Sequence, residues 1–465
     1  MSAHHPRLLL PIVLSGTFVQ LFSVTVMQVA VPDVQRDLAT GSGTGQLVLA
    51  GYTLTYACSL VVSARLGDRY GYRGMFVLGM ALFTLASLGS AFAPSAWLLV
   101  AGRLAQGVGS GLMAPQTLSL IRSSVPPDRR AAALSAFGAT MAAASMAGPV
   151  LGGVLIQFAP LGLGWRAAML LTVPVGLAAL ALSPVLPASR GGADGDRVDP
   201  VGATLSLLGL GLLVLPLTVG RDAGWPPWTW ASLVVAVVLL VGFALSQRRV
   251  PHPLVHPSTM SDPATRRGLG MVLVFNAGVP SFSLLLATHL QVAEGASPLR
   301  TGLTATPYAV GALVGSGMSA ALSARFGRWA LGGSSATLGL VCLAVAATIH
   351  EPALRWVLWL ALGAGGFAFG AFTSSAFTRI IAEARPEAAT SVSGLLPTAQ
   401  QLGGTVGVTF AGMAYAVPAS PGTALWHAMT YEVVVFALAA LLAVVRAPRA
   451  ADTSTARART PSVPL

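Results

Sequence analysis

The chain of 465 residues is 54% hydrophobic and only 9% charged, and its mean hydropathy is +0.74. A soluble globular domain is about 45–50% apolar and about 25% charged, so this composition excludes a soluble protein and predicts a multi-spanning membrane protein. All 27 basic residues are arginine, and the formal net charge is +12. We expect this excess to lie in cytoplasmic loops of a membrane protein rather than to bind nucleic acid.

Apolar stretches of about 20 residues, the length that crosses a bilayer core, recur along the chain with short connections between them. We count about fourteen, which predicts an all-α membrane protein. The first follows Arg7 and is too long for a signal peptide. In chain order the predicted spans are Leu8–Val31, Gly45–Ser63, Met75–Phe92, Trp97–Leu120, Ala131–Phe158, Trp165–Leu186, Val201–Gly220, Trp230–Ser246, Gly268–Leu290, Gly302–Ala324, Ala330–Ile349, Ala353–Ile380, Ala389–Val417 and Ala424–Val445.

The distribution of arginine orients these spans. With a cytoplasmic amino terminus, 21 arginines fall in inside segments and five in outside segments, while Arg103 lies within a span. The positive-inside rule therefore places both termini in the cytoplasm.

The connection Ala64–Arg73 is a charge-dense loop between two long apolar runs. Its glycines permit a tight reversal with positive φ. Its candidate functional residues are Gly67, Asp68, Arg69, Gly71 and Arg73.

A related stretch, Ala324–Gly327, follows 256 residues after Asp68–Gly71, with Ala324 in place of the acid. Parallel six-helix repeats are typical of secondary transporters. We therefore divide the chain into four parts. They are a six-helix bundle at 1–187, two additional helices at 188–250, a second six-helix bundle at 251–446, and a disordered cytoplasmic tail at 447–465.

Several motifs resemble those of one family, the major facilitator superfamily, and specifically its fourteen-span drug:proton antiporter branch. The resemblance covers nearly the whole chain. The motifs are the loop Ala64–Arg73, Arg103–Gly107, Gly148–Gly153, Trp165-Arg166 with Pro174–Gly176, Asp199–Gly202 and Gln401–Gly404.

The resemblance implies roles for three of these motifs. The loop around Asp68 would hold the two halves together in one state of an alternating-access cycle. Arg103 would lie near the proton and substrate path, with Gln106 beside it, and a charge within a span is functional by default. Gly148, Pro149, Gly152 and Gly153 would form the antiporter motif. Small residues there permit close helix packing, and the proline promotes a bend.

The chain departs from that family in the first span, where Ser23 and Gln28 occupy the positions of the usual aspartate and asparagine. Loss of the aspartate removes the usual proton carrier. Asp33 survives near the outer end of the span, and Glu432 is the one acidic residue in the middle of a span. We therefore name Glu432 and Asp33, together with Arg103, as candidate coupling residues.

Uncharged polar and aromatic residues within the spans are the candidate substrate contacts. His289, near the outer end of the ninth span, is interpreted as an interfacial histidine. The substrate candidates are Gln28, Gln46, Tyr52, Tyr56, Gln106, Gln116, Phe137, Asn276, Phe275, Phe372, Gln400 and Gln401.

The sequence therefore predicts a monomeric exporter in the bacterial inner membrane, which expels small amphipathic compounds such as antibiotics in exchange for protons. Its partners would be the lipid bilayer, the substrate and protons. An exporter of an endogenous secondary metabolite, with or without proton coupling, is the alternative. We find no phosphate-binding loop, metal-ligand spacing or catalytic cluster, and Cys58 and Cys342 lie in apolar runs, so we expect no enzyme, cofactor or metal site.

Overall fold

A computed structural model of the chain describes residues 6–40, 42–188, 199–220, 223–251, 253–255, 259, 261–383, 389–416 and 421–445. The predicted tail at 447–465 and most of the segment 188–198 lie outside this part of the chain. The long helices are α1 (Pro6–Asp37), α2 (Ser42–Tyr70), α3 (Tyr72–Ala91), α4 (Ala96–Ser124), α5 (Pro127–Phe158), α6 (Trp165–Leu170) continued by α7 (Thr172–Leu182), α8 (Pro200–Val219), α9 (Pro227–Ser246), α11 (Pro263–Thr288), α12 (Pro298–Phe326), α13 (Arg328–Thr348), α14 (Arg355–Glu383), α15 (Ala389–Ala416) and α16 (Pro421–Val444).

The prediction of an all-α membrane protein is confirmed. Among the described residues, 11 helices are long and apolar enough to cross a membrane, or up to 12 when α2, which bends by 53° after Leu60, is taken as one span. Helices α4 and α15 are also long but stand outside that count. The total of about fourteen spans therefore stays a prediction.

Helix starts follow local sequence signals. The side chain of Asp199 accepts a hydrogen bond from the Gly202 nitrogen at the start of α8, and Asp262 does the same for two nitrogens of α11. Each of these two helices also begins with a proline, whose fixed φ suits the first helical position and whose missing N–H is not needed there. The Asp199–Gly202 motif is therefore a helix cap in this fold.

The charge-dense connection differs from its prediction. We expected a loop over Ala64–Arg73, but α2 continues to Tyr70 and α3 begins at Tyr72, so Gly71 alone separates them. Gly71 has φ of 88°, a conformation that glycine adopts readily and other residues rarely do. One residue with positive φ, Gly71, is enough to reverse the chain between α2 and α3. The charged residues around it therefore lie on the ends of these helices and not in a loop.

The same break recurs in the second half. Gly327, 256 positions after Gly71, has φ of 54° and separates α12 from α13. The bounds of α12, Pro298–Phe326, are those of α2 displaced by the same offset. The two glycines therefore stand at equivalent places between helices of matching length, and the division of the chain into repeated bundles stays a prediction.

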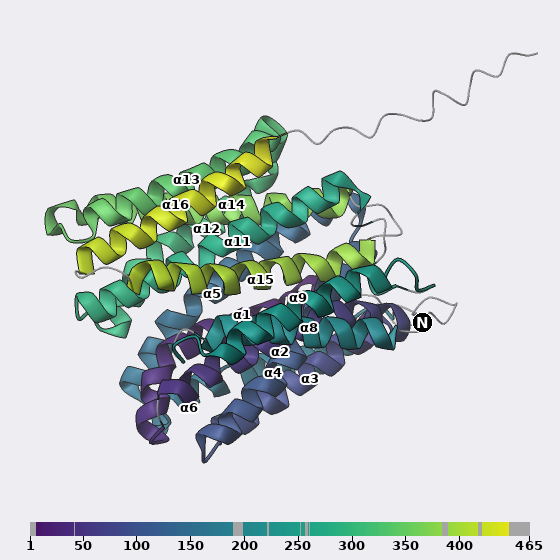
Figure 1. The fold of residues 1–465 in the computed structure, drawn as a ribbon, viewed down its shortest axis with the longest axis horizontal. Helices are drawn as coiled ribbons and strands as arrows, with labels where there is room; N and C mark the ends of the chain where they lie inside the picture. The colour runs from purple at the N-terminus through teal and green to yellow at the C-terminus, as the bar shows by residue number, and fades with distance from the viewer. Residues whose placement is uncertain are drawn as a thin grey trace, which may run out of the picture.

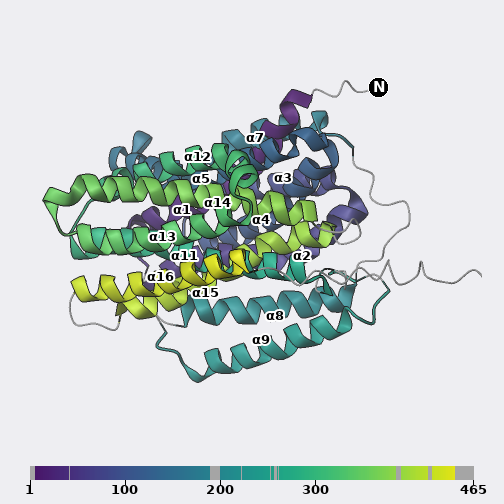
Figure 2. The same cartoon turned by 90° about the horizontal axis from the view of Figure 1, so that it is seen from above.

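The two halves lie side by side, with α1–α7 in one lobe and α11–α16 in the other (Figure 1). They meet where α5 packs against α12 and α14 and where α2 packs against α15. Helices α8 and α9 form a separate pair on the flank of the bundle (Figure 2). Of this pair, α8 contacts both α2 and α15, so the additional helices flank the junction between the halves.

Candidate functional site

Arg103 of α4 is 1% exposed and lies among neutral groups of three helices. Its Nε donates to the Val48 carbonyl at 3.1 Å, and its Nη1 donates to the Ser23 hydroxyl at 2.7 Å and to Gln106 Oε1 at 2.9 Å. The guanidinium carbon also lies 4.5 Å from the centre of the Tyr52 ring. The charge is therefore stabilised by dispersed dipoles and a π face, and no carboxylate forms an ion pair with it among the described residues.

The network continues outward from Arg103. Gln106 donates to the Ser87 hydroxyl at 2.7 Å, so its amide joins α4 to α3. The Tyr52 hydroxyl lies 2.6 Å from that of Ser110, and its ring stacks on Tyr56 with centroids 6.2 Å apart. Tyr52 and Gln106, predicted as substrate contacts, thus hold the guanidinium in place, while Tyr56 extends the aromatic surface.

Ser23 occupies the position at which the resemblance placed an aspartate in the family. The structure brings its hydroxyl into direct contact with Arg103. An acid at this position would form a buried ion pair with the arginine, whereas serine supplies only a neutral acceptor. The sequence identified the substitution, but only the packing of α1 against α4 identifies the partner that it affects.

Glu432 of α16 is 0% exposed, and neither carboxylate oxygen has a hydrogen-bond partner in the part of the chain that the structure describes. The Ser281 hydroxyl of α11 is near, but it donates to the Ala277 carbonyl at 2.6 Å. The Glu432 Oε2 atom lies 3.0 Å from where a Cβ would stand on Gly278, and the Phe436 ring covers the same side. This apolar site favours the neutral, protonated carboxyl over the anion.

The Asp68 carboxylate lies where helices α2 and α3 meet. We call this the arginine-rich end of the bundle, because Arg65, Arg69 and Arg73 lie there. Arg65 Nη1 is 3.3 Å from Asp68 Oδ2, and the Tyr72 hydroxyl donates to Oδ1 at 2.8 Å. The same Arg65 donates through Nε to the Leu254 carbonyl at 2.7 Å and through Nη2 to the Ser391 hydroxyl of α15 at 3.4 Å. Arg65, which was not among the predicted functional residues, therefore links the two halves, while Asp68 positions it.

Gly67 and Gln116 form a close contact between α2 and α4. An added Cβ on Gly67 would overlap Gln116 Oε1 and would stand 2.9 Å from the Tyr72 ring. The Gln116 amide donates to the Ser63 carbonyl at 2.7 Å. Gln116, a predicted substrate contact, is completely buried in this helix packing.

Two other predicted residues of the stretch Ala64–Arg73 make contacts away from Asp68. Arg73 Nη1 donates to the Leu186 carbonyl at 3.3 Å, which ties α3 to the segment after α7. Arg69 is exposed, and its guanidinium lies over the ring of Tyr70.

The predicted antiporter motif packs α5 against α1. An added Cβ on Gly148 would overlap the Thr25 side chain, and one on Gly152 would stand 2.7 Å from a methyl carbon of Val26. The Thr25 hydroxyl in turn donates to the Ala144 carbonyl at 3.4 Å. Small residues at every fourth position therefore permit this approach. Pro149 and Gly153 lie within the same helix.

The remaining predicted residues are dispersed. The Asn276 amide donates to the Val272 carbonyl of its own helix at 2.9 Å, and Asp33 pairs with Arg36 one turn away at the end of α1.

Gln28 is exposed, Gln400 and Gln401 are half-buried, and the side chain of Gln46 lies outside the described part of the chain. Phe275 stacks on Phe372, and Phe137 packs against Phe377 across the two halves.

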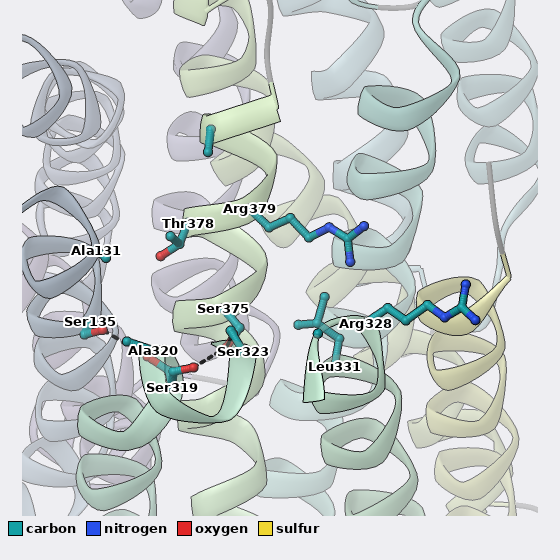
Figure 3. A pocket seen from close by; sticks show the side chains of 12 residues that line it. Ala131, Ser135, Ser319, Ala320, Ser323, Arg328, Leu331, Ser375, Thr378 and Arg379 are labelled. Carbon is teal, nitrogen blue, oxygen red and sulfur yellow. Dashed lines mark hydrogen bonds between the residues drawn. The ribbon is translucent and has the colours of Figure 1, made fainter. Parts of the chain in front are cut away.

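A cavity of about 440 Å³ lies at the arginine-rich end between α5 and the helices α12, α13 and α14. Figure 3 shows Ser135 of α5 facing Ser319 of α12, with hydroxyl oxygens 2.9 Å apart. Ser323 donates to Ser375 at 2.8 Å on the same wall. Hydroxyl contacts therefore line the junction of the halves at this end.

The sequence model of the Major Facilitator Superfamily matches residues 13–205 and 196–408 of the chain. The "Probable actinorhodin transporter" of Streptomyces coelicolor is 37% identical over 87% of this chain and 71% of that protein. The "Methylenomycin A resistance protein" of Bacillus subtilis is 30% identical over 92% of this chain and 91% of its own. The "Tetracenomycin C resistance and export protein" of Streptomyces glaucescens is 29% identical, over 86% and 74%.

The fold is also similar to solved structures. That of the human organic anion transporter MFSD10 superposes with a TM-score of 0.68 at 18% identity, covering 94% of this chain and 99% of that one. These matches indicate a multi-pass membrane transporter of a small-molecule substrate rather than an enzyme. The chain belongs to the Major Facilitator Superfamily.

Proposed function

We propose that this transporter exports small amphipathic organic compounds, antibiotics among them, by alternating access and in exchange for protons. The names of the relatives support the substrate class, since they are a transporter, a resistance protein and a resistance and export protein for different antibiotics. We further propose a bacterial inner-membrane location, with fourteen spans and both termini in the cytoplasm.

The observation that carries the coupling proposal is the buried, unpartnered carboxyl of Glu432. A charge within a membrane span is costly, so an ionisable side chain retained there indicates function. Tyr308 of α12 and Cys342 of α13 lie close enough to interact electrostatically with Glu432, and they add no cation to balance it. The carboxyl can therefore hold a proton in this state and release it when water enters.

Alternating access requires contacts between the halves that can open. At the arginine-rich end these include hydrogen bonds from Ser135 to Ser319 at 2.9 Å and from Arg65 to Ser391 at 3.4 Å and to the Leu254 carbonyl at 2.7 Å. A neutral hydrogen bond of this kind exchanges with water at a net cost of about 0.5–1.5 kcal/mol, and one from a charged group at about 1.5–3 kcal/mol. The two bundles can therefore rock about the junction by exchanging these hydrogen bonds for hydrogen bonds to water.

The test is accumulation of a panel of fluorescent cationic and neutral dyes in cells that express the chain, with and without a protonophore. We expect lower accumulation than in cells with empty vector, and loss of that difference when the proton gradient collapses. Efflux that persists after collapse would reject proton exchange. Equal accumulation in both strains for every dye, at verified membrane expression, would reject export of this substrate class.

A further inference from the structure

Three metal-ligating side chains converge at the end of the bundle opposite the arginine-rich connections. One ring nitrogen from His289, one from His350 and one carboxylate oxygen from Glu294 all lie within 4.8 Å of one another. His289 begins the π-helical segment His289–Ala293 that ends α11, and His350 follows α13. The cluster thus joins two helices of the second half and is separate from Glu432.

The π turn explains how two of these groups come together. The Glu294 nitrogen donates to the His289 carbonyl at 3.2 Å, five residues earlier. This spacing places Glu294 over His289, where a regular α-helix would stack residues four apart. The wider turn therefore presents an imidazole and a carboxylate on one face.

The second observation concerns the buried imidazole. His289 is 0% exposed, and its Nδ1 lies 3.2 Å from the Tyr415 hydroxyl of α15. Its Nε2 is buried and has no hydrogen-bond partner among the described residues. Metal-binding histidines are typically oriented in this way, with one nitrogen held by a polar neighbour and the other left for the ion. The interpretation of His289 as an ordinary interfacial histidine does not account for the unpartnered nitrogen.

The other two ligands are partly exposed, so their side chains have room to rotate. The side chains of His350 and Glu294 are 44% and 25% exposed, and His350 Nδ1 is 3.7 Å from Glu294 Oε1. Ligand atoms at about 2.0–2.2 Å from a zinc ion lie closer together than this, so a small rotation of both exposed side chains is needed. Two imidazoles and one carboxylate with an open fourth position match a common ligand set of Zn²⁺.

We propose that His289, Glu294 and His350 bind one Zn²⁺ ion, with Tyr415 as the positioning residue of His289. The bound ion fixes the last turn of α11 to the connection after α13. Because this links two helices within one half, the ion restrains the outer end of α11 and slows rearrangements that require it to bend.

The test is zinc binding by the full chain, purified in detergent with an affinity tag that lacks histidine. His4→Ala and His5→Ala form the background, because adjacent histidines in the sequence bind zinc themselves. Competition with a chromogenic zinc chelator is expected to show one Zn²⁺ per chain and no displacement by excess Mg²⁺, which prefers all-oxygen sites. Absence of stoichiometric zinc binding would overturn the proposal.

Variants locate the ion. His350→Ala and Glu294→Gln are expected to weaken binding by at least about tenfold, and Tyr415→Phe by about 10–100-fold because it leaves the ligands in place but removes the partner of Nδ1. His427→Ala, which removes an exposed histidine of α16, is the matched control and should bind as the background does. Unchanged binding in His350→Ala would place the ion elsewhere and reject the site.

Thermal unfolding separates lost binding from lost folding. Zinc should raise the unfolding temperature of the background protein but not that of His350→Ala, since a ligand stabilises only the state that binds it. Without zinc the two proteins should unfold at nearly the same temperature, because the His350 side chain is 44% exposed. An equal zinc-induced shift in both would contradict the assignment. None of these measurements depends on transport.

Discussion

The two halves of the transporter each bury one charge, and they treat it differently. Arg103 in the first half is surrounded by acceptors and an aromatic face, so its cation is stable where it lies. Glu432 in the second half has no hydrogen-bond donor to either oxygen among the described residues, so its anion is unstable there. A repeat of the same helices has thus produced a fixed charge in one half and a carboxyl that prefers to be neutral in the other.

This contrast assigns the two charges different tasks. A fixed cation shapes the electrostatic potential of the path throughout the cycle, whereas a carboxyl that ionises only when hydrated can carry a proton between the two sides. The predictions below test this division, from the largest expected effect to the smallest.

Glu432→Gln should remove the protonophore-sensitive part of dye efflux, down to the level of cells with empty vector. Glutamine keeps the volume of the side chain but cannot exchange a proton. The matched control is Glu383→Gln, which neutralises a half-exposed carboxylate paired with Arg379, and it should transport normally. Full gradient-dependent efflux by Glu432→Gln would remove Glu432 from the coupling mechanism.

Arg103→Lys should impair efflux strongly although the charge is conserved. A lysine ammonium is a compact charge on a flexible stem and cannot reproduce the fork that contacts Val48, Ser23 and Gln106 together. Dye efflux at equal membrane expression is the measurement, with the exposed Arg129→Lys as control. Normal efflux by Arg103→Lys would show that only the net charge matters at this position.

Ser23→Asp should make the first half resemble the second by adding a titratable acid. The Ser23 hydroxyl lies 2.7 Å from Arg103 Nη1, so a carboxylate at this position should gain a charge-assisted hydrogen bond, and we expect a higher unfolding temperature. In the Glu432→Gln background it should restore part of the gradient-dependent efflux. Ser23→Asn, which adds a similar side chain without a charge, should restore none, and equal efflux by both double variants would contradict the idea.

Gly67→Ala should destabilise the fold by about 1–3 kcal/mol, the usual cost of overpacking. The new Cβ would overlap Gln116, whereas Ser323, the counterpart of Gly67 in the second half, carries a side chain that bonds to Ser375. Gly74→Ala is the control, since its Cβ would meet nothing within 4 Å. The unfolding temperature of both variants in detergent checks this prediction, and equal values would contradict it.

The smallest effect concerns Asp37, beyond the end of the first span. A hydrogen bond from Arg166 lowers the pKa of this carboxyl below its usual value of 3.8. A lowered pKa stabilises the folded protein above the unfolded-state pKa, and this contribution is lost as pH falls through the folded-state pKa. For a half-exposed pair the contribution is about 0–1 kcal/mol.

Unfolding temperatures of the parent and Asp37→Asn should therefore differ slightly at pH 7 and converge below the usual pKa of aspartate. If the difference in unfolding temperature between the two proteins grew as the pH fell, the assigned stabilisation by the Asp37 carboxylate would be contradicted. No such convergence is expected for Gly74→Ala, which alters no titratable group.

The sequence by itself determined the fold class, because a bilayer requires long apolar helices and their lengths are visible in the composition. It also located Gly71, Gly327, Arg103 and Glu432, since a left-handed break or a charge within an apolar run stands out locally.

Tertiary structure alone decided which groups meet. Ser23 lies 80 positions before Arg103 and Arg65 lies far before Ser391, and no local pattern encodes such contacts. His289 and His350 come together only because α11 and α13 end at the same face. Similarly, Gln116 is suited by type to bind substrate, but the absence of a side chain on Gly67 lets it pack between helices instead. Hydropathy fixes where a helix lies along the chain, while shape and packing between helices fix what each polar side chain touches.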